Sequence, residues 1–274
     1  MKETRGVLMS EVLQRNNVKV IGDKKKVIMF AHGFGCDQTM WRHIVPSFAN
    51  EYKIVLFDYV GSGESDLNFY NAEKYDSLRG YVQDVLDIVE ALKLSDVIFV
   101  GHSVSSMIGM LAAIQKPDVF QRLVMIGPSP RYLNDDEYYG GFDESDIHEM
   151  LDLMEMNFIG WASYLAPIVA AVEKHPTVAT EVEKSFSSTN PKITKQFAEV
   201  TFFSDHRQDL EKSSIPVLII QCSEDSIVPL QVGEYLHRHI EKSEFKIIDV
   251  KGHYPHLSHP GETAELIKEY LYQV

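Results

Sequence analysis

Ser103 stands where the apolar run VIFV (97–100) meets the stretch GHSVS. A strand that turns sharply into a helix and carries a serine at the turn forms a nucleophile elbow, and the positions beside the serine must be small. Gly101 has the first small position, and Ser105 has the second, where glycine is usual. We expect the Ser105 hydroxyl to bond back to the helix backbone. The alternative interpretation is a helix N-cap without chemistry.

A serine hydroxyl is a weak nucleophile until a base takes its proton, and the base needs an acid that orients it. After an elbow of this kind, the acid and then a histidine follow along the chain. Asp225 follows the apolar run PVLIIQC (216–222), and His253 follows the run FKIIDV (245–250). We favour Asp225 over Glu224, which stays open as the alternative acid, because the SIVP segment after Asp225 would turn back toward the sheet edge. With the serine, Asp225 and His253 form the predicted catalytic triad.

The tail HYPHLSHP contains three histidines, His253, His256 and His259. Their spacing could suggest a metal site, but Pro255 and Pro260 disfavour a continuous helix, and no neighbouring carboxylate or cysteine completes a ligand set. We therefore expect no metal and no cofactor. His256 and His259 are predicted to be loop or surface residues.

The tetrahedral intermediate of acyl transfer needs N–H donors for its oxyanion. The first expected donor is the amide of Val104, and the second comes from the loop after an early strand. The stretch HGFG (32–35) fits that loop, with the Phe34 amide as the donor, although alone it could also be a plain glycine turn. The stretch VGSGES (60–65) lacks the third glycine of GxGxxG and the GK[ST] of a phosphate loop. We predict that it forms a turn beside the active-site edge.

The elements that must position these residues alternate between strand-like and helix-like runs up to about residue 130. Strand-like runs cover 18–22, 26–32, 52–60, 97–100, 122–128, 216–222 and 245–250, and helix-like runs cover part of 40–51, 78–94, the segment after the serine, and 262–273. In the run 78–94, apolar residues recur at spacings of three and four, as in an amphipathic helix. Alternation of this kind predicts an α/β fold with a mostly parallel sheet and helices on both faces.

The alternation stops near Pro130. Residues 132–205 show no clear strand, and helix-like stretches follow one another at 143–158, 160–174, 177–188 and 191–203. An inserted helical block predicts a cap over the carboxyl edge of the sheet, where open α/β sheets bind ligands. We expect a core of residues 9–130 and 206–274, a cap (lid) of residues 131–205, and a possible N-terminal extension of residues 1–8.

Composition excludes several classes of function. The 274 residues include 26 basic and 40 acidic side chains, and the net charge is −14. This charge argues against nucleic acid or an anionic membrane as the main partner, and no apolar run has the length of a membrane span. Cys36 and Cys222 show no metal or redox spacing, and the N-terminus lacks a secretory apolar segment. We expect a cytoplasmic protein with reduced thiols.

Several strings resemble one branch of the α/β-hydrolases: HGFGCDQTMW, FDYVGSGESD, GHSVSSMIG, GPSPRYLND, YYGGF, FFSDHR and GHYPHLSHP. They are similar to the RsbQ-type hydrolases, which regulate the sigma-B stress response in some bacteria, and to their relatives, the plant karrikin and strigolactone receptors. The resemblance runs from about Met9 to the C-terminus. GHSVS is the receptor-like form of the elbow, whereas CDQ, FFSDHR and SHP favour the RsbQ branch.

The resemblance implies the same triad, Ser103, Asp225 and His253, and a four-helix cap over a closed, mostly apolar substrate pocket. The pocket residues that it implies are Phe34, Tyr132, Phe142, Trp161, Leu165 and Phe202. Leu165 stands where the plant receptors tend to have an aromatic residue, so this chain departs from them there. Without the resemblance, an aromatic residue at helical spacing is more often a core residue than a pocket residue.

The sequence therefore predicts an RsbQ-like serine hydrolase that acts on or binds a small hydrophobic ester or lactone. By resemblance, it would positively regulate sigma-B energy-stress signalling with an RsbP-like PP2C-type phosphatase that carries a PAS sensor domain. The alternatives are a karrikin- or strigolactone-receptor-like protein with slow butenolide hydrolysis and a general carboxylesterase without a signalling role. A scaffold without activity has no need of the triad residues, and a cofactor-free oxygenase or perhydrolase on the same fold stays open.

Overall fold

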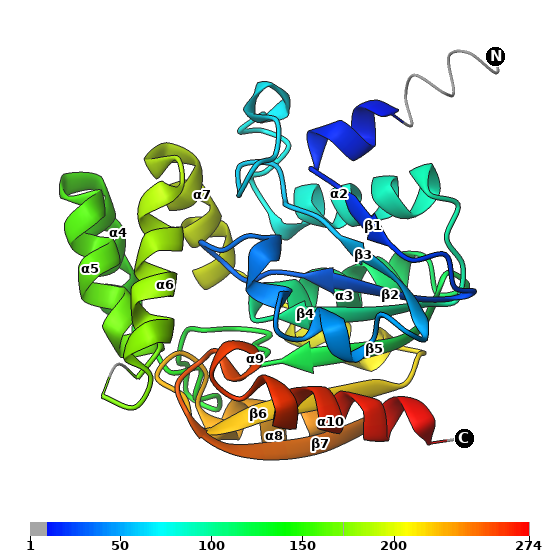
Figure 1. Cartoon of the computed structure of the whole chain (residues 1–274). Coiled ribbons are helices and arrows are strands. Elements are labelled where there is room, and N and C mark those ends of the chain that lie inside the picture. The colour runs from blue at the N-terminus through cyan, green and yellow to red at the C-terminus, as the bar shows by residue number, and fades with distance from the viewer. Residues whose placement is uncertain (1–9, 172, 274) are drawn as a thin grey trace.

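The computed structural model describes residues 10–171 and 173–273. The possible extension predicted at residues 1–8 lies outside this part. A twisted sheet runs through the middle of the molecule, and a group of helices stands beside one end of it (Figure 1). Within the described residues, no helix is long and apolar enough to cross a membrane.

In the described part of the chain, seven strands form the sheet: β1 (Lys19–Ile21), β2 (Lys26–Ala31), β3 (Tyr52–Leu56), β4 (Val97–His102), β5 (Phe120–Ile126), β6 (Val217–Glu224) and β7 (Ser243–Lys251). Their order is β1-β3-β2-β4-β5-β6-β7. The edge strand β1 pairs antiparallel with β3, and the other neighbours run parallel. The mostly parallel sheet predicted from the sequence is confirmed. The run predicted at 52–60 leaves the sheet after Leu56, and the Asp58 N–H donates to the Asn16 carbonyl instead (2.9 Å).

Helices cover both faces of this sheet. Outside the cap they are a helix at 10–15, α2 (Leu78–Ala91), α3 (Val104–Gln115), α8 (Leu230–His239), α9 (Pro255–Ser258) and α10 (Pro260–Tyr272), with short 3-10 helices η1 (Gln38–Trp41), η2 (Val45–Ser47), η3 (Leu67–Phe69) and η4 (Arg207–Lys212). Along β2, Val27 and Met29 join a buried cluster that includes residues of α2, α3 and α8, whereas Ile28 and Phe30 join a cluster that includes residues of α10. Successive strand residues point to opposite faces, so a strand covered on both sides is apolar throughout.

The described chain forms four α-helices between β5 and β6: α4 (Glu144–Met156), α5 (Phe158–Val169), α6 (Pro176–Ser188) and α7 (Pro191–Phe202). Figure 1 shows them together, beside the rest of the molecule. Arg131 and Asp205 form an isolated antiparallel bridge where the chain leaves and rejoins the core. We accordingly propose that residues 131–205 form the cap.

The predicted cap helices differ from the observed ones at two ends. Asn157 ends α4, and its side chain then accepts from the Gly160 N–H (2.9 Å) to begin α5, so the stretch 143–158 is not one helix. The helix predicted to reach residue 174 ends at Val169, and Ala171 has a positive φ of 50°. A left-handed residue interrupts a right-handed helix, and single-sequence periodicity does not reveal it.

Candidate active site

The elbow at Ser103 has the strained geometry expected of a nucleophile turn. Ser103 lies between the end of β4 and the start of α3, with φ 55° and ψ −125°, a conformation that non-glycine residues rarely adopt. A Cβ atom at Gly101 would lie 2.5 Å from the Ser105 carbonyl oxygen, so only glycine fits there. The Ser105 hydroxyl, however, donates to the His32 carbonyl and not to the helix backbone. Our expectation for its partner was wrong, because that partner is 73 residues away in the chain.

Three side chains from different loops meet at the carboxyl edge of the sheet. The His253 Nε2 lies 2.9 Å from the Ser103 Oγ, and the His253 Nδ1 lies 2.7 Å from the Asp225 Oδ2. A carboxylate only accepts hydrogen bonds, so Nδ1 carries the proton and Nε2 is free to accept the serine proton. The side chains of His253 and Asp225 are almost entirely buried.

The loops after β6 and β7 hold the acid and the base. The Oδ1 of Asp225 accepts from the backbone N–H groups of Ile227 (2.8 Å) and Val228 (3.1 Å), which leaves its Oδ2 for the histidine. The Glu224 side chain is exposed at the strand end. The structure therefore brings Asp225, the favoured acid, to His253, whereas the alternative acid Glu224 faces solvent. The His253 N–H donates to the Val169 carbonyl at the end of α5 (2.7 Å), so the cap contacts the base directly.

The predicted oxyanion loop lies directly on the elbow. A Cβ atom at Gly33 would lie 2.5 Å from the His102 Nδ1 and 3.4 Å from the Ser103 Cβ, so the backbone approaches the nucleophile closely. Among the described residues, the N–H groups of Phe34 and Val104 have no hydrogen-bond partner. Both amides are thus available to an oxyanion that forms at Ser103.

Comparison with known proteins identifies the family. The model of the alpha/beta hydrolase fold matches residues 26–260.

The chain belongs to the α/β-hydrolase family.

Among its relatives, this hydrolase is 37% identical over 96% of its length to the Karrikin insensitive 2 receptor CA of Petunia hybrida, of which 98% is covered. It is 36% identical over 95% of its length to the Strigolactone esterase D14 of Arabidopsis thaliana, of which 97% is covered. The structure of a hydrolase from Oleispira antarctica superposes with a TM-score of 0.94, at 40% identity over 97% of this chain and 98% of that one. The relation to the plant receptors that the sequence indicated is confirmed, and the chain is a hydrolase-family enzyme.

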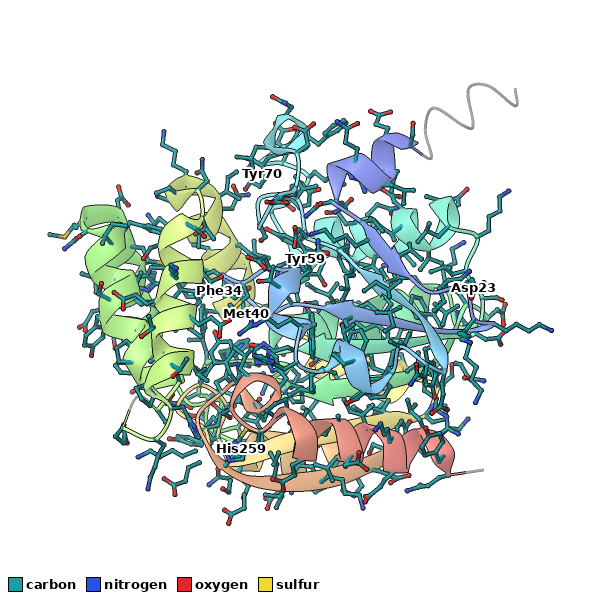
Figure 2. The ribbon with its side chains drawn as sticks, viewed as in Figure 1. Asp23, Phe34, Met40, Tyr59, Tyr70 and His259 are labelled. Atoms are coloured by element: carbon teal, nitrogen blue, oxygen red, sulfur yellow. The ribbon has the colours of Figure 1, made fainter. Side chains whose placement is uncertain are left out.

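The aromatic residues implied for the pocket gather in this hydrolase where the cap meets the sheet edge. The Phe34 ring centroid lies 6.0 Å from that of Trp161 and 6.1 Å from that of Phe202, and Figure 2 shows Phe34 between the cap helices and the core. Phe202 also contacts Tyr132 (5.0 Å) and Phe142 (5.9 Å). Leu165 is partly buried against the larger hydrophobic core that includes Phe34 and Trp161. That these residues line a substrate pocket stays a prediction.

Sequence reasoning missed two rings of this aromatic cluster. Phe186 of α6 stacks on Trp161 at 5.1 Å and lies 6.2 Å from Phe34, and Phe197 of α7 lies 5.7 Å from Phe34. Both sit on the apolar sides of stretches that were recognised as helices. Helical spacing could have singled them out as buried, but it could not have said that they face the Phe34 loop.

Tyr132 brings a hydroxyl close to the nucleophile. Its OH lies 3.5 Å from the Ser103 Oγ. Burial raises the pKa of Tyr132 to about 12, so the phenol stays protonated near neutral pH. Its hydroxyl can donate or accept a hydrogen bond beside the nucleophile.

The histidine tail of this hydrolase folds differently from the expectation. His256 lies in α9, fully buried, with its ring stacked on Trp41 at 4.6 Å. The prediction of a loop or surface position was therefore wrong for His256, since packing on a residue 215 positions earlier leaves no local signal. His259 is half-buried between α9 and α10.

Within residues 10–171 and 173–273, no group of three or more His, Cys, Asp or Glu side chains could hold a metal ion.

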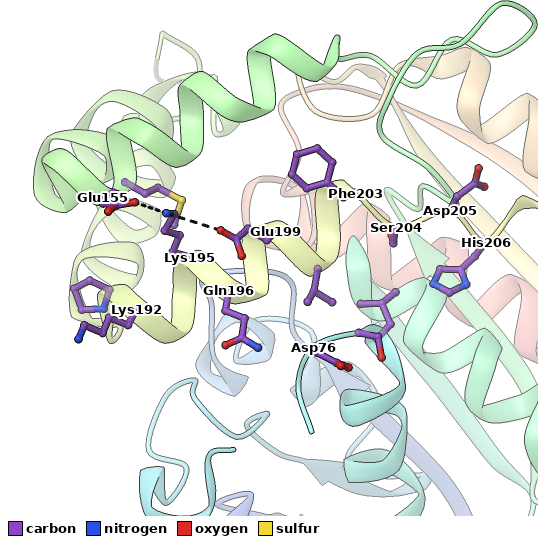
Figure 3. A pocket seen from close by; sticks show the side chains of 15 residues that line it. Asp76, Glu155, Lys192, Lys195, Gln196, Glu199, Phe203, Ser204, Asp205 and His206 are labelled. Atoms are coloured by element: carbon purple, nitrogen blue, oxygen red, sulfur yellow. Dashed lines mark hydrogen bonds and ion pairs between the residues drawn. The ribbon is translucent and has the colours of Figure 1, made fainter. Parts of the chain in front are cut away.

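A groove of about 1010 Å³ lies away from the triad. Figure 3 shows it along α7, where Lys195 lies between Glu155 and Glu199, with Asp76 across the groove. Residues of α4, α7 and the start of α2 line it, and none of them belongs to the triad. The candidate triad therefore lies outside this groove, at the sheet edge.

Proposed function

We propose that this protein is a serine hydrolase of small apolar esters or lactones, with Ser103 as the nucleophile, His253 as the base and Asp225 as the orienting acid. One observation carries the proposal: the buried chain of hydrogen bonds from Asp225 through His253 to Ser103, with contacts of 2.7 and 2.9 Å. This geometry supports proton removal from a serine that the strained turn presents to a substrate.

In the proposed reaction, the Ser103 Oγ attacks the substrate carbonyl while its proton passes to the His253 Nε2. The amides of Phe34 and Val104 bind the resulting oxyanion. The carbonyl re-forms, the bond to the leaving alkoxide breaks, and the protonated His253 gives that alkoxide its proton. Water then attacks the acyl-serine by the same steps and releases the acid, which restores Ser103. In a lactone, the leaving alkoxide stays attached to the acyl group until water releases it.

The surroundings of Ser103 support a small apolar substrate. Phe34, Tyr132, Trp161 and Phe202 are all buried. Together they present aromatic rings, the Tyr132 hydroxyl and the indole N–H of Trp161, which has no hydrogen-bond partner among the described residues. Apolar surface is stabilised when it leaves water, whereas a charged group would lose its hydration without a partner. A short acyl ester or a compact lactone fits these surroundings better than a charged substrate.

The relatives favour a ligand-receptor role over the sigma-B role that we placed first. They include proteins named as a karrikin receptor and as a strigolactone esterase. We propose that the chain resembles them in binding, and slowly hydrolysing, a butenolide-type lactone. Regulation of sigma-B and an RsbP-like phosphatase partner stay predictions that rest on the sequence strings alone.

The first experiment measures hydrolysis of a short p-nitrophenyl ester and records intact-protein mass, for the wild type and for Ser103→Ala and His253→Ala. We expect a turnover or an acyl adduct in the wild type that both variants lose. Equal background rates without an adduct in all three proteins would contradict a general esterase.

A second experiment separates a receptor from an esterase. A synthetic butenolide lactone is added to the wild type and to Ser103→Ala, and thermal unfolding and product formation are followed. For a receptor-like protein, we expect the butenolide to shift the unfolding temperature of both proteins and the wild type to form product only slowly. Rapid turnover in the wild type, with no change in the unfolding temperature of Ser103→Ala, would favour the esterase.

A further inference from the structure

Ser105 takes the elbow position where glycine is usual, and its hydroxyl has a specific task in the structure. The hydroxyl donates to the carbonyl of His32, directly after β2. His32 begins the HGFG stretch that carries the expected oxyanion donor. The bond therefore joins the nucleophile turn to the oxyanion loop.

A second hydroxyl completes this link. The Tyr59 OH lies 3.0 Å from the Ser105 Oγ. Because the Ser105 proton points at His32, the Tyr59 OH must be the donor, and burial raises the pKa of Tyr59 so that it keeps its proton. Ser105 and Tyr59 are fully buried, and His32 is almost so. A buried relay thus runs from the Tyr59 O–H through the Ser105 O–H to the His32 carbonyl.

The His32 ring holds the next peptide unit. Its Nε2 accepts from the Tyr59 backbone N–H (3.3 Å), so its Nδ1 carries the proton and donates to the Gly33 carbonyl (2.9 Å). The Gly33 carbonyl and the Phe34 N–H belong to one planar, trans peptide and point in opposite directions. Holding the Gly33 carbonyl therefore aims the Phe34 N–H.

We propose that Ser105 is a positioning residue for the oxyanion hole: its hydroxyl, oriented by Tyr59, holds the His32–Gly33 backbone so that the Phe34 amide faces the oxyanion. Only the kinetic test of this inference rests on the proposed function. Losing a whole oxyanion donor costs a factor of about 10² to 10³ in kcat. Misaiming one donor should cost less, so we expect about a tenfold loss of kcat.

The test uses Ser105→Ala and Ser105→Gly, with Ser106→Ala as the matched control. Ser106 is also fully buried in α3, but its hydroxyl bonds to the Gly101 carbonyl (2.9 Å) and does not touch the oxyanion loop. Hydrogen–deuterium exchange is followed in residues 32–37, where the Cys36 N–H reports on the loop through its bond to the Gly33 carbonyl (3.3 Å). We expect faster exchange there in both Ser105 variants and no change in Ser106→Ala.

Kinetics then separate positioning from general damage. In both Ser105 variants, kcat for the p-nitrophenyl ester should fall about tenfold with little change in KM, because the oxyanion forms only in the transition state. Binding of phenylboronic acid, which forms a tetrahedral anion on a serine, should weaken by a similar factor. If Ser105 had a purely structural role, its loss would lower the unfolding temperature without lowering kcat selectively over KM.

Tyr59→Phe keeps Ser105 and removes only the upstream donor, so it tests the relay if the Ser105 variants fold poorly. It should reproduce part of the loss, and its effect should vanish in the Ser105→Ala background. Unchanged exchange in residues 32–37 in both Tyr59→Phe and Ser105→Ala would overturn the inference, as would faster exchange with unchanged kcat. A wild type without Ser103-dependent hydrolysis would instead defeat the proposed function, and the exchange result would still decide whether Ser105 holds the loop.

Discussion

The sheet edge and the cap surround the same serine but are built from different interactions. At the sheet edge, Asp225, His253 and Ser103 are joined by directional hydrogen bonds between buried polar groups. In the cap, rings such as those of Phe186 and Phe202 pack around Phe34 without such bonds. Hydrogen bonds weaken steeply when their geometry changes, whereas apolar contacts are non-directional. The sheet edge is therefore suited to fixed chemistry, and the cap is suited to a choice of ligand.

We expect the largest effect from a variant that disrupts the hydrogen bonds at the sheet edge. Asp225→Asn keeps the shape of the acid but cannot accept the His253 Nδ1–H as a carboxylate does, so the imidazole loses its correct tautomer. We expect kcat to fall by about 10³ to 10⁴, measured with the p-nitrophenyl ester. The control is Glu224→Gln, which changes the exposed neighbouring acid and should retain wild-type kcat. A comparable loss in both variants would mean that the wrong acid has been assigned.

We expect the next largest effect from a variant that removes an aromatic ring from the cap. Phe186→Ala removes a buried ring that packs on Trp161 and Phe34, and a loss of about 3–5 kcal/mol in the free energy of unfolding is expected. The same change should raise KM more than it lowers kcat. Urea unfolding and ester kinetics measure both.

Phe48→Ala is the control for the cap variant, because Phe48 is equally buried but belongs to the cluster on the α10 side of the sheet. It should cost similar stability with little change in KM. If both variants changed KM alike, the cap would have no special role in ligand choice.

The buried histidines His102 and His256 make the stability depend on pH. Burial, with smaller contributions from His253 and Arg42, lowers the pKa of His256 to about 3, and burial also lowers the pKa of His102. Both rings are neutral in the folded protein but take up a proton below about pH 6.5 when unfolded. The unfolded state then binds more protons, so stability falls as the pH drops from about 6.5 toward 3.

Each histidine adds up to about 1.4 kcal/mol per pH unit to this slope. Urea unfolding between pH 4 and 7 measures it, and His256→Phe, which keeps a ring against Trp41, should reduce it. An unchanged slope in His256→Phe would show that other groups cause the acid sensitivity.

The smallest expected effect lies on the cap surface. Lys195 pairs with Glu155 and Glu199 at the exposed rim of the groove, and exposed ion pairs are screened by water and salt. Lys195→Gln should leave the unfolding midpoint nearly unchanged at both low and high salt. The buried Asp84, which accepts from Lys74, Tyr75 and Asn16, provides the contrast, because Asp84→Asn should destabilise the protein clearly. If the two variants changed the unfolding midpoint equally, burial would not explain how much each ion pair contributes to stability.

Much of the fold could be predicted because it depends on local pattern. The apolar runs of β2, β4 and β6 are buried on both faces, so each appears in the sequence as an unbroken apolar stretch. The helix α2 shows its buried face as a spacing of three and four. Helix ends in the cap were less predictable, because Asn157 and Ala171 end or begin helices through backbone conformation that periodicity does not encode.

In the candidate site, too, some contacts could be predicted from the sequence and others could not. The serine, the acid and the histidine could be proposed as a triad because they follow strand ends in a fixed chain order, and parallel strands bring such ends to one edge, where the three side chains meet. The pairing of Phe186 with Phe34 was not found, since α6 reaches the loop only after the cap has folded.

By itself, the sequence determined the α/β architecture, the elbow at Ser103 and the order of the residues that could activate it, because these depend on periodicity and on position along the chain. The tertiary structure decided that Asp225 and not Glu224 faces His253, that His256 is buried, and that Ser105 bonds to His32. Each of these depends on which distant groups meet in space. Such meetings are set by the packing of whole elements, and no short stretch of sequence records them.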